Sequence, residues 1–250
     1  MNKKVLFTVL AVLLLGASGC ATQPVAENGS DDPAEPPNRA MYTFNDKVDE
    51  YVLRPVAEKY AEYTPKVMRE GVTNFFDNLT YLNVMLNNFL QGKVVKGFSD
   101  VGRIVVNTTL GIGGLFDPAS AWGIPKHKED FGQTLAVWGA GEGAYLVLPF
   151  LGPSSVRDAP DYATSTLLNP FLYITSPIIA PISILGIINK RANLLEATRL
   201  RDEAALDPYT FTREAYRQKR TNDIYDGNPP REDLNEFIEE ENGRGVLRIK

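Results

Sequence analysis

Residues 72–92 read VTNFFDNLTYLNVMLNNFLQG, and this stretch decides the fold class of the chain. Its apolar residues recur every three or four positions, the spacing of one face of an α-helix. They are Val72, Phe75, Leu79, Leu82, Leu86 and Phe89. Asparagines occupy the opposite side, where Asp77 is the only charged residue. A helix in water usually carries Lys and Glu there, so we predict a long helix whose asparagine side can face a polar interior.

The preceding segment also has helical spacing, carried by Met41, Phe44, Val48 and Tyr51. Asn38 follows two prolines, and its side chain suits the cap of this helix. Pro55 fits the first turn of a second helix, or a kink in the first.

Helical patterns continue after the central stretch. The segment from Val94 predicts a helix that ends near Gly111, where glycine permits a left-handed exit. A charged helical pattern covers Lys190–Leu206. Asp207 is a capping residue followed by proline at the first helical position, so a further helix starts there.

Strand signals are weak in this sequence. Alternation with period two occurs only at Thr134–Trp138 and Tyr145–Leu148. We therefore predict a mainly α fold.

Residues 162–189 contain no Asp, Glu, Lys or Arg. Such a stretch costs nothing in lipid and is hard to explain on a surface facing water. Leu167–Asn189 has the length of a membrane span, but prolines at positions 170, 177 and 181 interrupt it. We therefore do not expect a straight transmembrane helix. Composition alone allows a buried core segment or immersion in a membrane, and lipid attachment at the N-terminus favours the membrane.

The N-terminal residues predict that attachment. Lys3 and Lys4 precede an apolar run, Val5–Leu15, and the small residues after it end at Cys20, the only cysteine. This pattern is typical of a bacterial lipoprotein signal. The alternative is an ordinary secretory signal cut near Cys20. Ala21, which replaces the Asp that favours retention at the inner membrane, indicates the outer membrane of a Gram-negative cell.

Composition predicts the domain organisation. We expect a signal peptide at 1–19, a lipidated flexible tether at 20–37, one helical domain at 38–226 and an acidic, disordered tail at 227–250. The formal charge of −5 becomes −7 once the two positive charges of Lys3 and Lys4 leave. An acidic chain without a basic stripe is not expected to bind nucleic acid.

The sequence resembles the MlaA (VacJ) family of outer-membrane lipoproteins. The stretches that carry the resemblance are Asn38–Asn45 (NRAMYTFN), Arg54–Ala57 (RPVA), Asn88–Gly92 (NFLQG), Asn107–Gly114 (NTTLGIGG), Phe131–Leu135 (FGQTL), Leu148–Phe150 (LPF) through Val156–Asp158 (VRD), Asp207–Tyr209 (DPY) and Arg213–Tyr216 (REAY). They follow the family order across residues 38–225.

The resemblance implies a ring-shaped helical domain with an amphiphilic channel, lying on the periplasmic side with membrane-embedded helices. It implies removal of mislocalised phospholipid from the outer leaflet, transfer to a soluble periplasmic lipid carrier, and a trimeric porin as neighbour. No cofactor, metal or catalytic residue is expected. Candidate residues of the lipid channel are Phe44, Asn45, Asn74 and Asn78.

A hinged hairpin beside the channel is predicted within residues 131–158. Its joints would be Gly139, Gly141 and Gly143, and its arms Leu135–Trp138 and Tyr145–Phe150, which include the gate candidates Leu148, Pro149 and Phe150. Glycine tolerates backbone angles closed to other residues, so these joints can absorb a swing. A static tight turn would use the same glycines.

Two other classes of protein compete with lipid transport. A periplasmic hydrolase would need a catalytic group, but His127 lies between lysines, as in a solvated loop, and spacing alone does not make a glycosidase pair of Glu142 and Asp158. The glycines around Glu142 lack the context of a nucleotide loop. A structural, porin-associated envelope lipoprotein is the other alternative, and it would need no lipid-sized interior.

Overall fold

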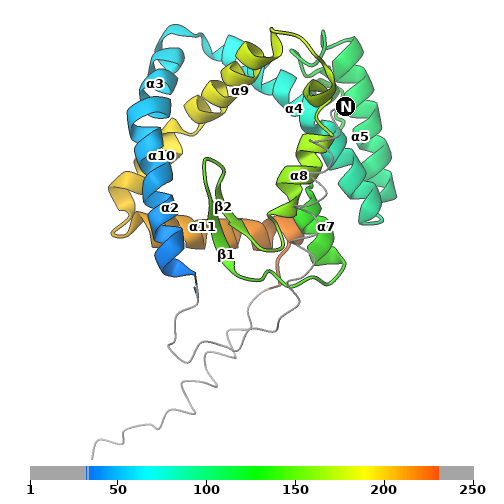
Figure 1. Cartoon of the computed structure of the whole chain (residues 1–250). Helices are drawn as coiled ribbons and strands as arrows, with labels where there is room; N and C mark the ends of the chain where they lie inside the picture. Colours follow the sequence, from blue (N-terminus) through cyan, green and yellow to red (C-terminus); the bar gives the residue numbers. More distant parts are fainter. Residues whose placement is uncertain (1–31, 33, 231–250) are drawn as a thin grey trace, which may run out of the picture.

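The computed structural model describes Asp32 and residues 34–230, and these form a mainly helical domain (Figure 1). The elements in chain order are α2 (Glu35–Val48), the π-helical η1 (Asp49–Leu53), α3 (Arg54–Tyr63), α4 (Lys66–Leu90), α5 (Val94–Thr109), α6 (Pro118–Ala121), α7 (Phe131–Val137), β1 (Tyr145–Leu148), β2 (Gly152–Ser155), α8 (Pro160–Leu167), the 3₁₀ turn η2 (Pro170–Tyr173), α9 (Ile179–Asn193), α10 (Leu195–Ala204) and α11 (Pro208–Ile224). The predicted signal peptide, Cys20, most of the tether and most of the acidic tail lie outside the described residues.

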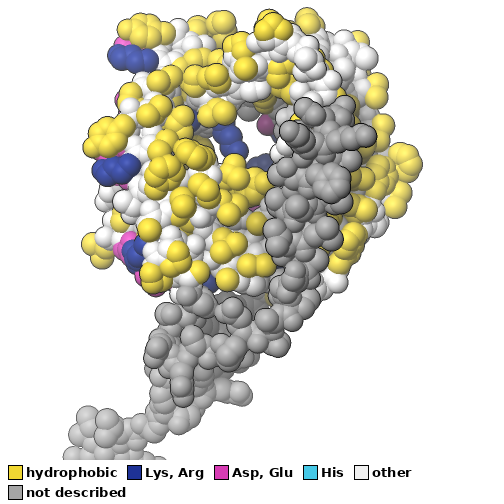
Figure 2. All heavy atoms as spheres, in the orientation of Figure 1, with side chains coloured by type: hydrophobic (Ala, Val, Ile, Leu, Met, Phe, Trp, Pro, Cys, Tyr) yellow, Lys and Arg dark blue, Asp and Glu magenta, His cyan; other side chains and the backbone are white. Residues whose placement is uncertain are grey.

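The helices surround a central opening (Figure 1). Helices α2 and α3 form one side, α4 and α9 the next, α5, α7 and α8 the opposite side, and α11 closes the ring. The antiparallel hairpin β1–β2 extends from the α11 side into the opening. Figure 2 shows a hollow at this place, with hydrophobic side chains around it and charged side chains visible inside it.

Buried side chains of the ring are more often polar than apolar. Among the described residues, seven apolar or aromatic side chains are buried against sixteen polar or charged ones. A hydrophobic cluster within the described part of the chain consists of Tyr145, Val147 and Tyr209, with Met41, Tyr42 and Tyr216 packed on it. Buried polar groups must be paired to be tolerated, so hydrogen bonds and ion pairs supply much of the specificity of this fold.

The outer surface, in contrast, exposes many large apolar side chains. The exposed residues include Val95 and Phe98 on α5 and Ile184 and Ile187 on α9, each more than half accessible. Yellow side chains cover much of the face in Figure 2. Extended apolar surface of this kind marks contact with a membrane or another protein.

The charge-poor segment belongs to this apolar surface. It contains most of α8, η2 and most of α9, and Tyr173, Ile178 and Ile184 are 62%, 58% and 56% exposed. The alternative of a buried core segment is therefore wrong. Within the described part of the chain, no helix combines the length and the apolar character needed to cross a bilayer.

Several sequence predictions are confirmed. The central stretch is α4, which begins at Lys66. Pro55 lies in the first turn of α3, directly after the π-helical η1, and Asp207 caps α11 by accepting from Tyr209 N and Thr210 N. These signals depend on residues of the same helix, which is why the sequence alone reveals them.

Other predictions are wrong. Asn38 does not cap α2, because the helix begins at Glu35. The side-chain amide of Asn38 instead donates to Tyr145 O in β1. The left-handed exit of α5 lies at Ile112 and Gly113 rather than at Gly111. Thr134–Trp138 belongs to α7 and the turn that ends it.

Candidate functional site

Two asparagines of α2 bind the outer edge of the hairpin. Asn38 Nδ2 donates to Tyr145 O at 2.8 Å, and Asn38 Oδ1 accepts from Val147 N at 2.9 Å. Asn45 Nδ2 donates to Leu148 O at 2.9 Å, and Asn45 Oδ1 accepts from Phe150 N at 2.8 Å. Each amide therefore pairs with the hairpin as a neighbouring strand would.

The spacing of the two asparagines fits the strand. The seven residue steps from Asn38 to Asn45 advance about 10.5 Å along the helix axis, and the three steps from Tyr145 to Leu148 advance about 10 Å along the strand. Helix α2 thereby covers an edge that would otherwise expose unpaired peptide groups. We call the contacts of Asn38 and Asn45 with the hairpin the hairpin latch.

An aromatic pair adds to the latch at the hairpin tip. The rings of Phe44 and Phe150 meet edge to face with centroids 5.3 Å apart. Phe150 is 73% exposed and has a positive φ of 62°, a strained conformation for a bulky residue. The structure thus joins channel candidates Phe44 and Asn45 with gate candidates Leu148 and Phe150, and Pro149 lies in the same turn.

The glycine joints lie elsewhere. Gly139, Gly141 and Gly143 connect α7 to β1, at the base of the hairpin, and Gly139 and Gly143 have positive φ. The arms of the hairpin are β1 and β2, so the predicted arm Leu135–Trp138 is wrong. Sequence reasoning missed β2 because Gly-Pro-Ser-Ser has no alternating apolar residues.

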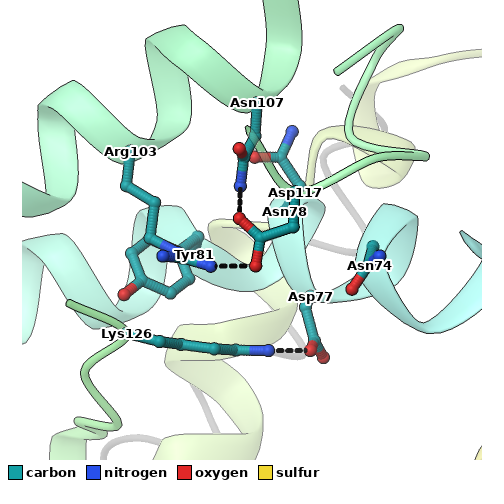
Figure 3. Close-up of a pocket in the computed structure, with 8 residues that line it drawn as sticks. All are labelled: Asn74, Asp77, Asn78, Tyr81, Arg103, Asn107, Asp117 and Lys126. Carbon is teal, nitrogen blue, oxygen red and sulfur yellow. Dashed lines mark hydrogen bonds and ion pairs between the residues drawn. The ribbon is translucent and has the colours of Figure 1, made fainter. Parts of the chain in front are cut away.

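Asn74 and Asn78 border a pocket of about 10 Å³ between α4 and α5 (Figure 3). That volume holds about one water. Asn78 Nδ2 donates to Thr108 Oγ1 at 3.0 Å, and Asn74 Nδ2 lies 3.5 Å from Leu115 O. In this structure these two amides tie α4 to α5 and to the loop after it.

Charged residues complete the polar contacts around this pocket. Arg103 is buried and pairs with Asp117, which also accepts from Asn107 Nδ2 at 3.0 Å (Figure 3). Lys126 pairs with Asp77 at 2.5 Å. Every charge here has a partner, so the arrangement holds the helices together.

The remaining asparagines of α4 are buried in a polar network. Asn83 Nδ2 donates to Asp161 at 3.1 Å, Asn87 accepts from Thr134 Oγ1 at 2.7 Å, and Asn88 Nδ2 donates to Asp100 at 2.7 Å. At these positions, α4 carries asparagines in place of charged residues because this side of the helix packs against α5, α7 and α8.

A buried ion network attaches α11 to the opposite elements. Arg220 pairs with Asp130 at 2.5 and 2.6 Å and with Asp158 at 2.8 and 2.9 Å. Burial alone would raise the pKa of Asp158, but hydrogen bonds from Arg157 and Arg220 outweigh it and hold that pKa well below its usual range. The same balance lowers the pKa of Asp130.

Two of the three residues weighed for an enzyme, Asp158 and His127, are engaged in structural contacts. Asp158 is bound by Arg157, Arg220 and Tyr216, which leaves it an ionised structural carboxylate. His127 is not simply solvated, because its Nδ1 lies 2.7 Å from the buried Asp100 and its backbone N donates to Tyr81 Oη at 2.8 Å. Both residues fasten loops to helices.

The fold defines a class of protein: a helical ring with an apolar outer surface and a hairpin held in its opening. The chain belongs to the MlaA lipoprotein family, whose profile matches residues 30–223. The resemblance predicted from sequence is therefore confirmed, as is the mainly α, single-domain fold.

Relatives share most of their length with this chain. The intermembrane phospholipid transport system lipoproteins MlaA of Shigella flexneri and Escherichia coli K12 are each 37% identical over 217 residues, covering 84% of this chain and 86% of the relative. That of Haemophilus influenzae is 32% identical over 232 residues, covering 88% and 91%.

A solved structure has a similar fold. It comes from work on the structural basis for maintenance of bacterial outer membrane lipid asymmetry and matches with a TM-score of 0.67 at 35% identity. The match covers 80% of this chain and 100% of the solved chain.

Proposed function

We propose that this protein is an outer-membrane lipoprotein that removes mislocalised phospholipid from the outer leaflet and passes it to a soluble periplasmic carrier. The observation that carries the proposal is the ring itself, with apolar side chains outside and charged side chains within its hollow. The names of the relatives, which are phospholipid transport lipoproteins, support it.

Transport of a phospholipid requires its polar head group to pass through the apolar part of the membrane. Moving a polar head group into hydrocarbon without new partners costs several kcal/mol. A ring that is apolar outside and polar inside offers such partners while its outer surface contacts acyl chains. No bond is made or broken, so catalysis is not required.

Attachment to the membrane would have two components. Acyl chains on Cys20 would anchor the N-terminus, because each buried methylene contributes about 0.8 kcal/mol. The exposed apolar residues of α5 and α9 would lie in one leaflet, which needs no helix that crosses the bilayer. A trimeric porin is the proposed neighbour in the membrane.

The hairpin is the proposed gate of the opening. Gly139, Gly141 and Gly143 at its base supply the flexible joint, and the hairpin latch holds its tip. Loosening the latch should therefore change the rate of lipid transfer without changing membrane attachment.

The alternative is a structural, porin-associated lipoprotein. Mass spectrometry of lipids that co-purify with the mature protein separates the two. Transport predicts phospholipid bound in stoichiometric amount, whereas a protein free of lipid would support the structural role.

A further inference from the structure

Helix α11, which closes the ring, meets the start of α2 at a buried carboxylate (Figure 1). Asp32 lies three residues before α2 and is only 2% exposed. Its Oδ1 accepts from Ala34 N at 3.2 Å, and its Oδ2 accepts from Tyr209 Oη on α11. Arg213, also on α11, has its Nη1 3.6 Å from the same oxygen. Asp32 therefore binds the chain that enters the ring to the helix that completes it.

The same carboxylate also contacts the hairpin latch. Asp32 Oδ1 accepts from Asn38 Nδ2 at 3.3 Å, and this amide nitrogen donates as well to Tyr145 O at 2.8 Å. A primary amide nitrogen has two hydrogens, so it can serve both acceptors at once. Asn38 Oδ1 meanwhile accepts from Val147 N at 2.9 Å. Both polar atoms of the Asn38 side chain are thus engaged, and the charged group among their partners is Asp32.

This arrangement favours one orientation of the Asn38 amide. If the amide turned over, its oxygen would face two acceptors, Asp32 Oδ1 and Tyr145 O, and its nitrogen would face the donor on Val147. Two acceptors that face each other repel, and an unpaired polar atom inside a protein is costly. Hydrogen bonds to a charged acceptor are also stronger than those to a neutral one. The carboxylate therefore stabilises the orientation in which Asn38 can bind β1.

Aromatic packing fixes the surroundings of the carboxylate. Tyr209, whose hydroxyl binds Asp32, has its ring centroid 6.2 Å from that of Tyr145. Both rings belong to the hydrophobic cluster of β1 and α11. The guanidinium of Arg39 lies 4.4 Å from the centroid of the Tyr209 ring. Because its neighbours are already ordered, the carboxylate can orient the latch at a small cost in conformational entropy.

We propose that Asp32 is a positioning residue of the gate, which orients the Asn38 amide so that α2 holds β1. The inference rests on the proposed function of the hairpin as a gate, and it identifies a residue outside the hairpin latch on which the latch depends. Asp32 follows Cys20 by twelve positions, so the chain that would carry the lipid anchor enters the ring at the latch. The Asn45 half of the latch has its own partners in the hairpin, so only the Asn38 half should respond to a change at Asp32.

Hydrogen exchange in the mature lipoprotein, held in amphipol, tests this role. Asp32→Ala removes the carboxylate, and exchange of the Val147 amide should then rise on the order of tenfold, because Asn38 is no longer held in the orientation that binds it. Exchange of the Phe150 amide should stay as in the wild type. Asp32→Asn should keep most of the protection at Val147, since its side-chain oxygen can still accept from Asn38.

Two comparisons separate positioning from a general loosening of the ring. Glu35→Gln is the matched control, because Glu35 is three residues further along and its carboxylate pairs with Arg39. This variant should leave the exchange of Val147 unchanged. In an Asn38→Ala background, Asp32→Ala should add nothing to the exchange of Val147, because the residue through which it acts is missing. A carboxylate that only stabilised the ring would add the same factor in both backgrounds.

The role of Asp32 is overturned by unchanged Val147 exchange in Asp32→Ala, by an equal rise at Val147 and Phe150, or by an equal response in the two backgrounds. If Asp32→Ala does not fold, Tyr209→Phe carries the test, since it removes only the hydroxyl that donates to the carboxylate. A rise at Val147 that vanishes in the Asn38→Ala background then supports the role, and unchanged exchange overturns it.

Transfer assays keep this inference apart from the function on which it rests. Raised Val147 exchange together with an altered rate of lipid transfer in Asp32→Ala would support both. Raised exchange with transfer at the wild-type rate would overturn the hairpin as the gate, and with it the part of Asp32 in gating. Wild-type exchange in a variant that transfers lipid would overturn the role of Asp32 and leave transport standing.

Discussion

Replacement of Asn45 by alanine tests the hairpin latch. The substitution removes two hydrogen bonds to the hairpin tip, those with Leu148 O and Phe150 N. Each contributes about 1 kcal/mol net, so the tip should lose about 2 kcal/mol. That loss shifts the equilibrium between held and free tip by a factor of about 30.

Hydrogen exchange measures the shift directly. Exchange of the Phe150 amide should rise by up to about 30-fold when the Asn45 contacts of the latch are lost. The Val147 amide, held by Asn38, should keep its protection. Thr43→Ala is the matched control, because Thr43 is on the same helix and its side chain, among the described residues, bonds to the helix backbone at Arg39 O and not to the hairpin.

Two outcomes would refute this reasoning. Unchanged exchange at Phe150 would mean that Asn45 does not hold the tip. An equal rise in Thr43→Ala would mean that α2 itself had loosened. If the latch also controls a gate, Asn45→Ala should alter the rate of lipid transfer as well, while the fraction bound to membranes stays constant.

Three further predictions concern the anchor, the apolar surface and the ion network. Cys20→Ser should abolish palmitate labelling and leave the protein in the periplasm or with an uncleaved signal; unchanged labelling would exclude Cys20 as the anchor. Ile184→Asp should reduce membrane partitioning while the circular dichroism spectrum stays the same, since Ile184 is 56% exposed in the folded protein and a carboxylate at depth in lipid costs about 2.5–3.5 kcal/mol; an unfolded variant that still partitions like the wild type would contradict this. Asp130 and Asp158 have folded-state pKa values below the unfolded value of about 3.9, so the unfolded state takes up protons first as the pH falls. The contribution of these two carboxylates to the free energy of unfolding should be constant from pH 8 to about 5 and decrease below about pH 4. Asp158→Asn should reduce that decrease while lowering stability at pH 7 by about 3 kcal/mol; a chemical-denaturation series in which wild type and variant share the same acid limb would contradict the assignment.

Local signals made much of the helical framework predictable. The apolar spacing of α4 and the Asp207 cap of α11 depend on residues within a few positions of one another. Tertiary structure did not override them. The ring shape is expected from the family resemblance alone, since no spacing in the sequence indicates it.

The contacts of the site, in contrast, depend on distant residues. The sequence predicts a helix cap at Asn38 because a buried asparagine and a capping asparagine look the same in sequence, and its partner Tyr145 is 107 positions away. Asn45 and Phe150 are both candidates from the sequence, but nothing in their spacing shows that they meet.

Transfer of phospholipid by the purified protein tests the central claim most directly. The mature lipoprotein is reconstituted into vesicles that carry a labelled phospholipid, and the label that reaches a soluble lipid-binding acceptor is measured over time. The account predicts transfer that depends on the amount of lipoprotein and changes in Asn45→Ala. Transfer no faster than from protein-free vesicles, with the lipoprotein folded and membrane-bound, would contradict it.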